Sequence, residues 1–188
     1  IKKSYDFDNI SLVPQQNICE SRLDTNITSE IIKGIMLNIP LIASNMPSVC
    51  DSQFCIKLEQ LGSMGVLPRT FSIEFRTSET RKVARNCKWV ATSIGIDDSI
   101  ENVKELINSG ANVLFLDVAN CYSDYTIEFA KKIKQEFFDI KLVLGDTTHP
   151  GIIYRADFVD DLKIGIGTGY VFSTFDVTGF TEGQFSAI

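Results

Sequence analysis

The sequence predicts a single α/β domain built on a parallel sheet of about six strand–helix units. Short apolar, β-branched runs begin roughly every 20 to 28 residues, which is the repeat expected when helices connect parallel strands. The runs are continuously apolar rather than alternating, as is typical of strands covered on both faces. Six such units fit either an open doubly wound sheet or three quarters of a (β/α)8 barrel, and the periodicity does not choose between them.

The predicted strands share an apolar centre flanked by polar or turn residues. They are residues 40–44, 65–68, 89–95, 113–119, 141–145 and 162–167. Residues 1–35 show neither strand nor helix periodicity, so they are expected to form an irregular segment across the end of the sheet.

Helix signals are clearest after the third and fourth predicted strands. Ser99 is expected to cap a helix that ends near Gly110, and Ser123 to cap a helix over 124–138. The lysine cluster 131–134 in the second helix fits a solvated face better than a binding patch.

Composition excludes several classes of function. The 188 residues carry 18 basic and 24 acidic side chains, a net charge of −6, with no basic block for a nucleic-acid backbone. No apolar run approaches the roughly 18 residues of a membrane span. Five cysteines without a metal-binding spacing indicate reduced thiols. We therefore expect a cytoplasmic protein without nucleic-acid or membrane partners.

Polar side chains follow several predicted strands, at the edge where parallel α/β folds carry their sites. Asp117 is an acidic residue at the end of its predicted strand. Its carboxylate can accept hydrogen bonds from a ligand hydroxyl or from loop amides, and the sequence favours neither interpretation. His149 is interpreted as a loop residue rather than a catalytic base, because no partner acid is evident. The alternate glycines Gly165, Gly167 and Gly169 fit either close approach of a ligand or a plain tight turn.

Several segments resemble GMP reductases. The run 116–123, LDVANCYS, is similar to that family's LDVANGYS, and LIASNMPSV at 41–49 to IIASNMDTV. KIGIGTGYVFSTFDVTG at 163–179 resembles the catalytic loop KVGIGPGSVCTTRxxTG, and 183–188 resembles PQLSAV. IMP dehydrogenases share this barrel, but most carry a regulatory insert of about a hundred residues. Only about twenty residues separate Pro68 from Trp89, which favours the reductase.

The resemblance implies a (β/α)8 TIM barrel, of which this chain supplies about six units, and NADPH-dependent reductive deamination of GMP to IMP. It also implies either a homo-oligomer, which would be a tetramer as in the family, or a partner chain that completes the barrel. It also implies a monovalent cation such as K⁺, held by backbone carbonyls of Gly167 and Gly169. The residues it assigns are Thr174 as catalytic; Ser44, Asn45, Met46, Gly169 and Tyr170 beside the nucleotide; and Asp117, Ala119, Asn120 and Asp146 beside the cofactor.

The sequence departs from the family at decisive positions. Phe172 stands where the family has its nucleophilic cysteine, and phenylalanine cannot form the covalent purine intermediate. The family's asparagine after the fifth strand is Asp146, which would repel a phosphate. The family's last two strands and catalytic glutamate are not among these residues, so the chain is expected to be a piece of something longer or to be completed by another chain. Two hypotheses remain: a reductase-like enzyme completed elsewhere, or a catalytically inactive nucleotide-binding or assembly subunit.

Overall fold

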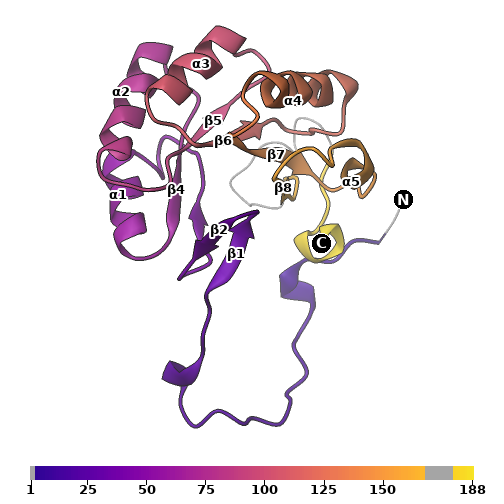
Figure 1. Ribbon diagram of the computed structural model, residues 1–188. Coiled ribbons are helices and arrows are strands. Elements are labelled where there is room, and N and C mark those ends of the chain that lie inside the picture. The colour runs from indigo at the N-terminus through magenta and orange to yellow at the C-terminus, as the bar shows by residue number, and fades with distance from the viewer. Residues whose placement is uncertain (1–2, 168–179) are drawn as a thin grey trace.

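A computed structural model describes residues 3–167 and 180–188, and its main sheet has six parallel strands (Figure 1). Their spatial order follows the chain without reversal. A doubly wound sheet reverses its order at a switch point, so the consecutive order selects a barrel-type sheet. The strands are β3 (Ile42–Ala43), β4 (Met64–Leu67), β5 (Ala91–Ile94), β6 (Val113–Asp117), β7 (Lys141–Thr147) and β8 (Asp161–Ile164).

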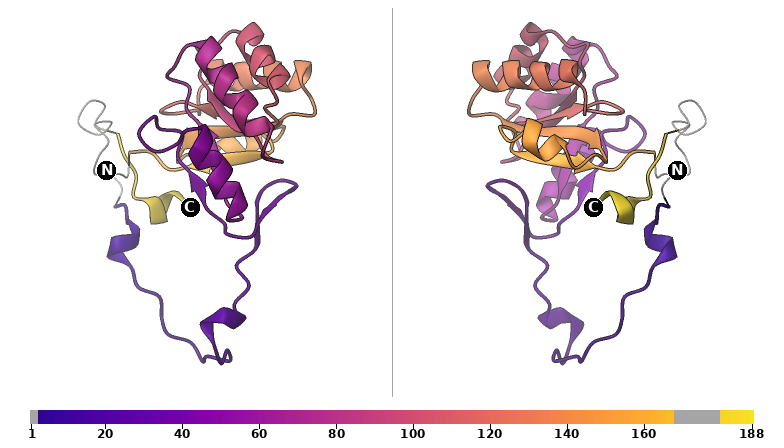
Figure 2. Two further views of the ribbon diagram at one scale, coloured as in Figure 1. Left: turned by 90° about the vertical axis from the view of Figure 1, so that its left-hand side faces the viewer. Right: turned by 90° about the vertical axis from the view of Figure 1, so that its right-hand side faces the viewer.

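Four helices cover the outer face of this curled sheet, and a short fifth follows β7 (Figures 1 and 2). Together they make a partial TIM barrel, as predicted. The outer core joins helix residues such as Val103 and Ile127 to strand residues such as Leu114 and Leu144, all at most 1% exposed. The helices are α1 (Ser52–Gln60), α2 (Ile73–Ala84), α3 (Ile100–Asn108), α4 (Asp124–Glu136) and α5 (Ile152–Arg155).

The N-terminal segment is more ordered near its end than the sequence predicts. Strands β1 (Ser29–Ile32) and β2 (Ile35–Leu37) form an antiparallel hairpin, turned at Gly34, whose φ of 84° favours glycine. Its apolar residues Ile32 and Ile35 are buried on the inner face of the sheet. The expectation of irregular structure therefore fails for residues 29–32 and for Ile35, because their apolar side chains cover the inner face of the sheet.

The two ends of the chain lie side by side (Figure 1). Short 3₁₀ turns at Phe7–Asn9 and Arg22–Asp24 are the regular structure before β1. The last helix, α7 (Gln184–Ala187), is tied to the start of the chain, where the Tyr5 amide donates to Ser186 Oγ at 2.8 Å. Among the described residues, no helix is long and apolar enough to cross a membrane.

The predicted helix starts are confirmed, as is the end of α3 near Gly110, whereas α4 ends at Glu136, two residues before the predicted end. The side chains of Ser99 and Ser123 accept hydrogen bonds at the starts of α3 and α4, and Gly110 has a φ of 107°. One lysine differs from the prediction: Lys134 is half-buried rather than solvated. Its Nζ donates to the Ile140 carbonyl and pairs with Asp160 at 2.9 Å, so it joins the end of α4 to the sheet.

Candidate functional site

Four polar side chains, three from neighbouring strands and one from the loop after β3, meet inside the carboxyl edge of the sheet. Lys163 of β8 places its Nζ 2.9 Å from Asp117 Oδ1 and 2.7 Å from Asp146 Oδ1. From the loop after β3, Asn45 donates to Asp117 Oδ2 at 2.9 Å. We call these four residues the Lys163 cluster. Two carboxylates share one ammonium, so the cluster carries a net negative charge when all three groups are ionised.

The backbone explains why these side chains converge. Parallel pairing aligns Asp117 of β6 with Gly145 of β7, and Gly145 with Lys163 of β8. A Cβ on Gly145 would lie 2.5 Å from the Lys163 Cβ, so glycine is what allows the lysine side chain this position. The ends of β6 and β7 are also joined, because the Val118 amide donates to the Gly145 carbonyl at 2.8 Å.

Charge and burial shift the proton affinities within the cluster. Burial raises the pKa of Asp146, and the neighbouring Lys163 ammonium offsets this only in part. Burial works to lower the pKa of Lys163, but the Asp146 and Asp117 carboxylates outweigh it and hold the pKa above its ordinary value. Asp146 therefore holds a proton more readily than an ordinary aspartate does.

One oxygen of the cluster has an unused hydrogen-bonding capacity. Asp146 Oδ1 is buried, and although Lys163 faces it as an ion pair, no donor among residues 3–167 and 180–188 is aligned with it for a hydrogen bond. Buried acceptors without donors are rare in folded proteins. The Lys163 ammonium at 2.7 Å already stabilises its charge, and a ligand N–H or O–H group could supply the aligned donor.

An apolar cavity of about 260 Å³ lies against the cluster, along the inner face of the sheet. Pockets that take drug-sized ligands measure about 300–1,000 Å³, so this space suits one ring system rather than a whole dinucleotide. Convergent polar groups beside an apolar cavity are typical of a small-molecule site. Its walls include Ile31, Ile42, Ser44, Asn45, Val66, Phe115, Val143 and Lys163.

The predicted site residues fall into three groups. Asn45, Asp117 and Asp146 come together, and Ser44 lines the cavity beside them. Met46 is half-buried in the same loop. Ala119 and Asn120 are exposed, and Asn120 accepts a hydrogen bond from the Tyr122 amide at 3.1 Å. Gly169, Tyr170, Phe172 and Thr174 lie outside the described residues.

Sequence reasoning did not assign a role to the lysine at the centre of the cluster. The available signal was a charged residue inside an otherwise apolar strand, between Leu162 and Ile164, since a lysine is rarely buried without a partner. It also missed the stacking of Tyr122 on His149, whose ring centroids are 4.3 Å apart.

Two groups implied by the family can be tested against these residues. The polar cluster beside an apolar cavity fits a nicotinamide or purine ring, with Asp117 and Asp146 as acceptors and Asn45 as a donor. For the monovalent cation, the carbonyl of Gly167 is one of the two predicted ligands. This carbonyl and that of Ile166 accept from the Thr181 hydroxyl, each at 3.0 Å. The cation site remains a prediction.

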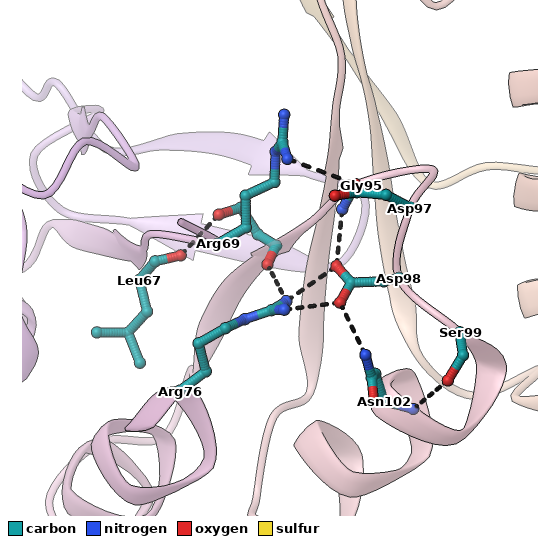
Figure 3. Close-up of polar contacts among 9 residues, drawn as sticks. Leu67, Arg69, Arg76, Gly95, Asp97, Asp98, Ser99 and Asn102 are labelled. Carbon is teal, nitrogen blue, oxygen red and sulfur yellow. Dashed lines mark hydrogen bonds and ion pairs between the residues drawn. The ribbon is translucent and has the colours of Figure 1, made fainter. Parts of the chain in front are cut away.

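A second ion pair lies outside the sheet, between α2 and the loop that precedes α3 (Figure 3). Arg76 donates to both oxygens of Asp98, at 2.7 and 3.1 Å. The Gly95 amide donates to Asp98 Oδ2 at 2.9 Å, and Asn102 Nδ2 to Asp98 Oδ1 at 3.3 Å. We call this the Arg76 pair.

Comparison with known proteins gives one consistent match. The family model described as "IMP dehydrogenase / GMP reductase domain" matches residues 4–188. The chain is 30% identical over 186 residues to a GMP reductase of Lactobacillus delbrueckii subsp. bulgaricus, covering 96% of this chain and 56% of the relative. It is 26% identical to an inosine-5'-monophosphate dehydrogenase of Borreliella burgdorferi, covering all of this chain and 59% of the relative.

A GMP reductase of Onchocerca volvulus is 27% identical, over 97% of this chain and 54% of the relative. The chain thus spans a little over half the length of these curated relatives. The matches run over nearly all of its residues and agree with its partial barrel. The chain belongs to the IMP dehydrogenase / GMP reductase family.

Proposed function

We propose that this chain forms the nucleotide-binding part of a GMP reductase-like oxidoreductase and that it does not turn over by itself. The observation that carries the proposal is the Lys163 cluster at the rim of an apolar cavity, where donors and acceptors converge from three strands and the loop after β3. Relatives named GMP reductase support GMP or IMP as the nucleotide, with NADPH as the cofactor.

Each residue of the cluster has a distinct part in this proposal. Lys163 and Asn45 fix the Asp117 carboxylate from two sides, so that it presents a preorganised acceptor to a ligand amide or hydroxyl. Asp146, with its raised pKa, can hold a proton close to that carboxylate. NADPH, when bound, supplies the hydride that reduces the purine.

Phe172 is the specific reason to doubt turnover by this chain. The family reaction needs a thiolate at this position to attack the purine, and a phenyl ring has no lone pair or acidic proton. Phe172 favours the second candidate function, a nucleotide-binding or assembly subunit without covalent chemistry. In either case we propose an oligomer or a partner chain that completes the barrel.

Steady-state NADPH oxidation with GMP separates the two candidates. We expect no GMP-dependent rate from the purified chain, and a clear rate would contradict the proposed inactivity. Phe172→Cys restores the missing thiol, so in the completed barrel it should give a measurable rate. Calorimetric titration of GMP, IMP and NADPH then tests binding alone. Absence of heat from all three would remove the nucleotide-binding proposal, and IMP-dependent reduction of NAD⁺ would instead indicate a dehydrogenase.

A further inference from the structure

Two thiols, Cys50 and Cys55, lie in contact beneath the loop that carries Asn45. Their Sγ atoms are 3.4 Å apart, and the two residues are 1% and 3% exposed. They flank Asp51, the N-cap of α1, at the two positions that commonly pack together at a helix start. A Cβ on Gly65 would lie 2.9 Å from both sulfurs, so glycine leaves them their space.

The two thiols differ in their affinity for a proton. A hydrogen bond with Cys55 lowers the pKa of Cys50, against the effect of burial. The same contact, together with burial, raises the pKa of Cys55 well above its ordinary range. For comparison, burial raises the pKa of Cys87 and of Cys121 to about 11. The contact thus stabilises a thiolate within the pair, and Cys50 is the member of the pair that borders a cavity.

A small cavity gives access to Cys50. It measures about 80 Å³, and Cys50 forms part of its wall. A water molecule needs about 10–15 Å³ of such space, so a molecule of the size of hydrogen peroxide fits. Phe71, Phe75 and Arg76 line the same cavity.

We propose that Cys50 and Cys55 form a peroxide-reactive pair that closes to a disulfide. The Cys50 thiolate attacks one oxygen of hydrogen peroxide; the O–O bond breaks, and the hydroxide released takes up a proton to become water. The Cys55 sulfur then attacks the sulfenic acid of Cys50, and the S–O bond breaks as the S–S bond forms. The Cys55 proton leaves with that hydroxide as a second water. The two sulfurs are oxidised and the peroxide is reduced.

The pair is connected to the candidate site through the backbone. The Cys50 amide donates to the Met46 carbonyl at 2.9 Å, and the Met46 amide to the Ser44 carbonyl at 2.8 Å. A disulfide shortens the sulfur separation by about 1.4 Å, to about 2.05 Å. Where rotation of the cysteine side chains does not close this gap, the loop has to shift, and the same loop holds Asn45 against Asp117. Loss of that hydrogen bond would weaken ligand binding about two- to tenfold, an effect that rests on the proposed function, whereas the disulfide itself does not.

Peptide mapping tests the pair directly. Cleavage after Lys33 and Lys57 releases residues 34–57, which contain Cys50 and Cys55 and no other cysteine. The purified protein, with exposed Cys19 changed to serine, is treated with hydrogen peroxide, alkylated under denaturing conditions and digested. We expect this peptide to be lighter by two hydrogen atoms and to carry no alkyl group. Its disulfide should form about tenfold faster than Cys87 or Cys121 is oxidised.

Variants assign the order of the two steps. Cys55→Ser should accumulate a sulfenic acid at Cys50 that dimedone traps, whereas Cys50→Ser should give no adduct on Cys55. Cys87→Ser is the matched control and should leave the disulfide yield unchanged. Full alkylation of both thiols after peroxide, or a disulfide from Cys55 to Cys87, would overturn the proposal. Because the mapping on the Cys19→Ser protein needs no change at the pair, a misfolded pair variant does not leave the question open.

Discussion

The Arg76 pair is a buried ion pair, whereas the charged side chains of the Lys163 cluster are only half-buried, and the surroundings of the two also differ. At the Arg76 pair one cation meets one carboxylate, and each Asp98 oxygen accepts two hydrogen bonds (Figure 3). Arg76 Nε has no partner among the described residues, so the contrast concerns the carboxylates. At the Lys163 cluster one cation meets two carboxylates, and an oxygen of Asp146 has no aligned donor among the described residues.

The difference separates a structural contact from a binding site. A carboxylate with balanced charge and a full set of donors has nothing left to offer a ligand, and its loss should be felt as instability. A cluster with excess negative charge beside a cavity retains both an acceptor and a proton-holding group. The two pairs should therefore respond in opposite ways to mutation and to pH.

Loss of the Arg76 guanidinium should cause the largest change in stability. Arg76 and Asp98 side chains are 5% and 8% exposed, so Arg76→Ala leaves a buried carboxylate without its counter-charge. Removing one partner of a buried pair typically costs about 3–5 kcal/mol. We expect a decrease of that size in the free energy of unfolding, measured by urea denaturation. A decrease below about 1 kcal/mol would show that water or a rearranged loop compensates the Asp98 carboxylate. The ion pair would then contribute little to the stability of the fold.

At the Lys163 cluster, mutation should change binding more than stability. Lys163→Met leaves Asp117 and Asp146 facing each other across the cavity rim, so we expect nucleotide affinity to fall about tenfold or more, as measured by calorimetry. Asp146→Asn in the same chain removes the excess charge and should recover part of the affinity. If the double variant binds no better than Lys163→Met, the two carboxylates are not coupled through Lys163.

The sequence predicted the fold better than the chemistry of this site. Apolar runs at a regular spacing locate the six strands, and capping serines locate α3 and α4, because both signals are local. Asn45 and Asp117 could be placed at one edge since parallel strands all end there. The role of Lys163 depends on which carboxylates face it, and the burial of Arg76 depends on a loop about 20 residues away. Local periodicity encodes neither of these contacts.

The pH dependence should have opposite signs at the two carboxylates. Arg76 and the Gly95 amide outweigh burial and hold the pKa of Asp98 below its ordinary 3.8, so its stabilising effect is present above pH 3.8 and is lost as the pH falls through the folded-state value. Burial raises the pKa of Asp146; its folded state binds the proton more tightly, and stability falls as the pH rises from 3.8 through the folded-state value.

Urea denaturation between pH 3 and 7 can separate these effects. The stability difference between wild type and Asp98→Asn should grow as the pH rises from 3. The free energy of unfolding of wild type minus that of Asp146→Asn should become less positive or more negative as the pH rises above 4. The same sign for both variants would contradict the assignment of one carboxylate to structure and the other to the site.

The smallest effect is expected beside the Arg76 pair, at the neighbouring contact of Arg69 with Asp97. The two side chains approach to 3.5 Å and are 34% and 79% exposed, so water screens the attraction and both remain solvated when one is removed. Asp97→Asn should change the free energy of unfolding by less than about 1 kcal/mol, although it lies next to Asp98 in the chain. The matched variant Asp98→Asn, at a fully bonded and buried carboxylate, should cost several times more. Equal losses would mean that the loop before α3 is stabilised as a whole, and that the buried hydrogen bonds of Asp98 do not distinguish it from its exposed neighbour.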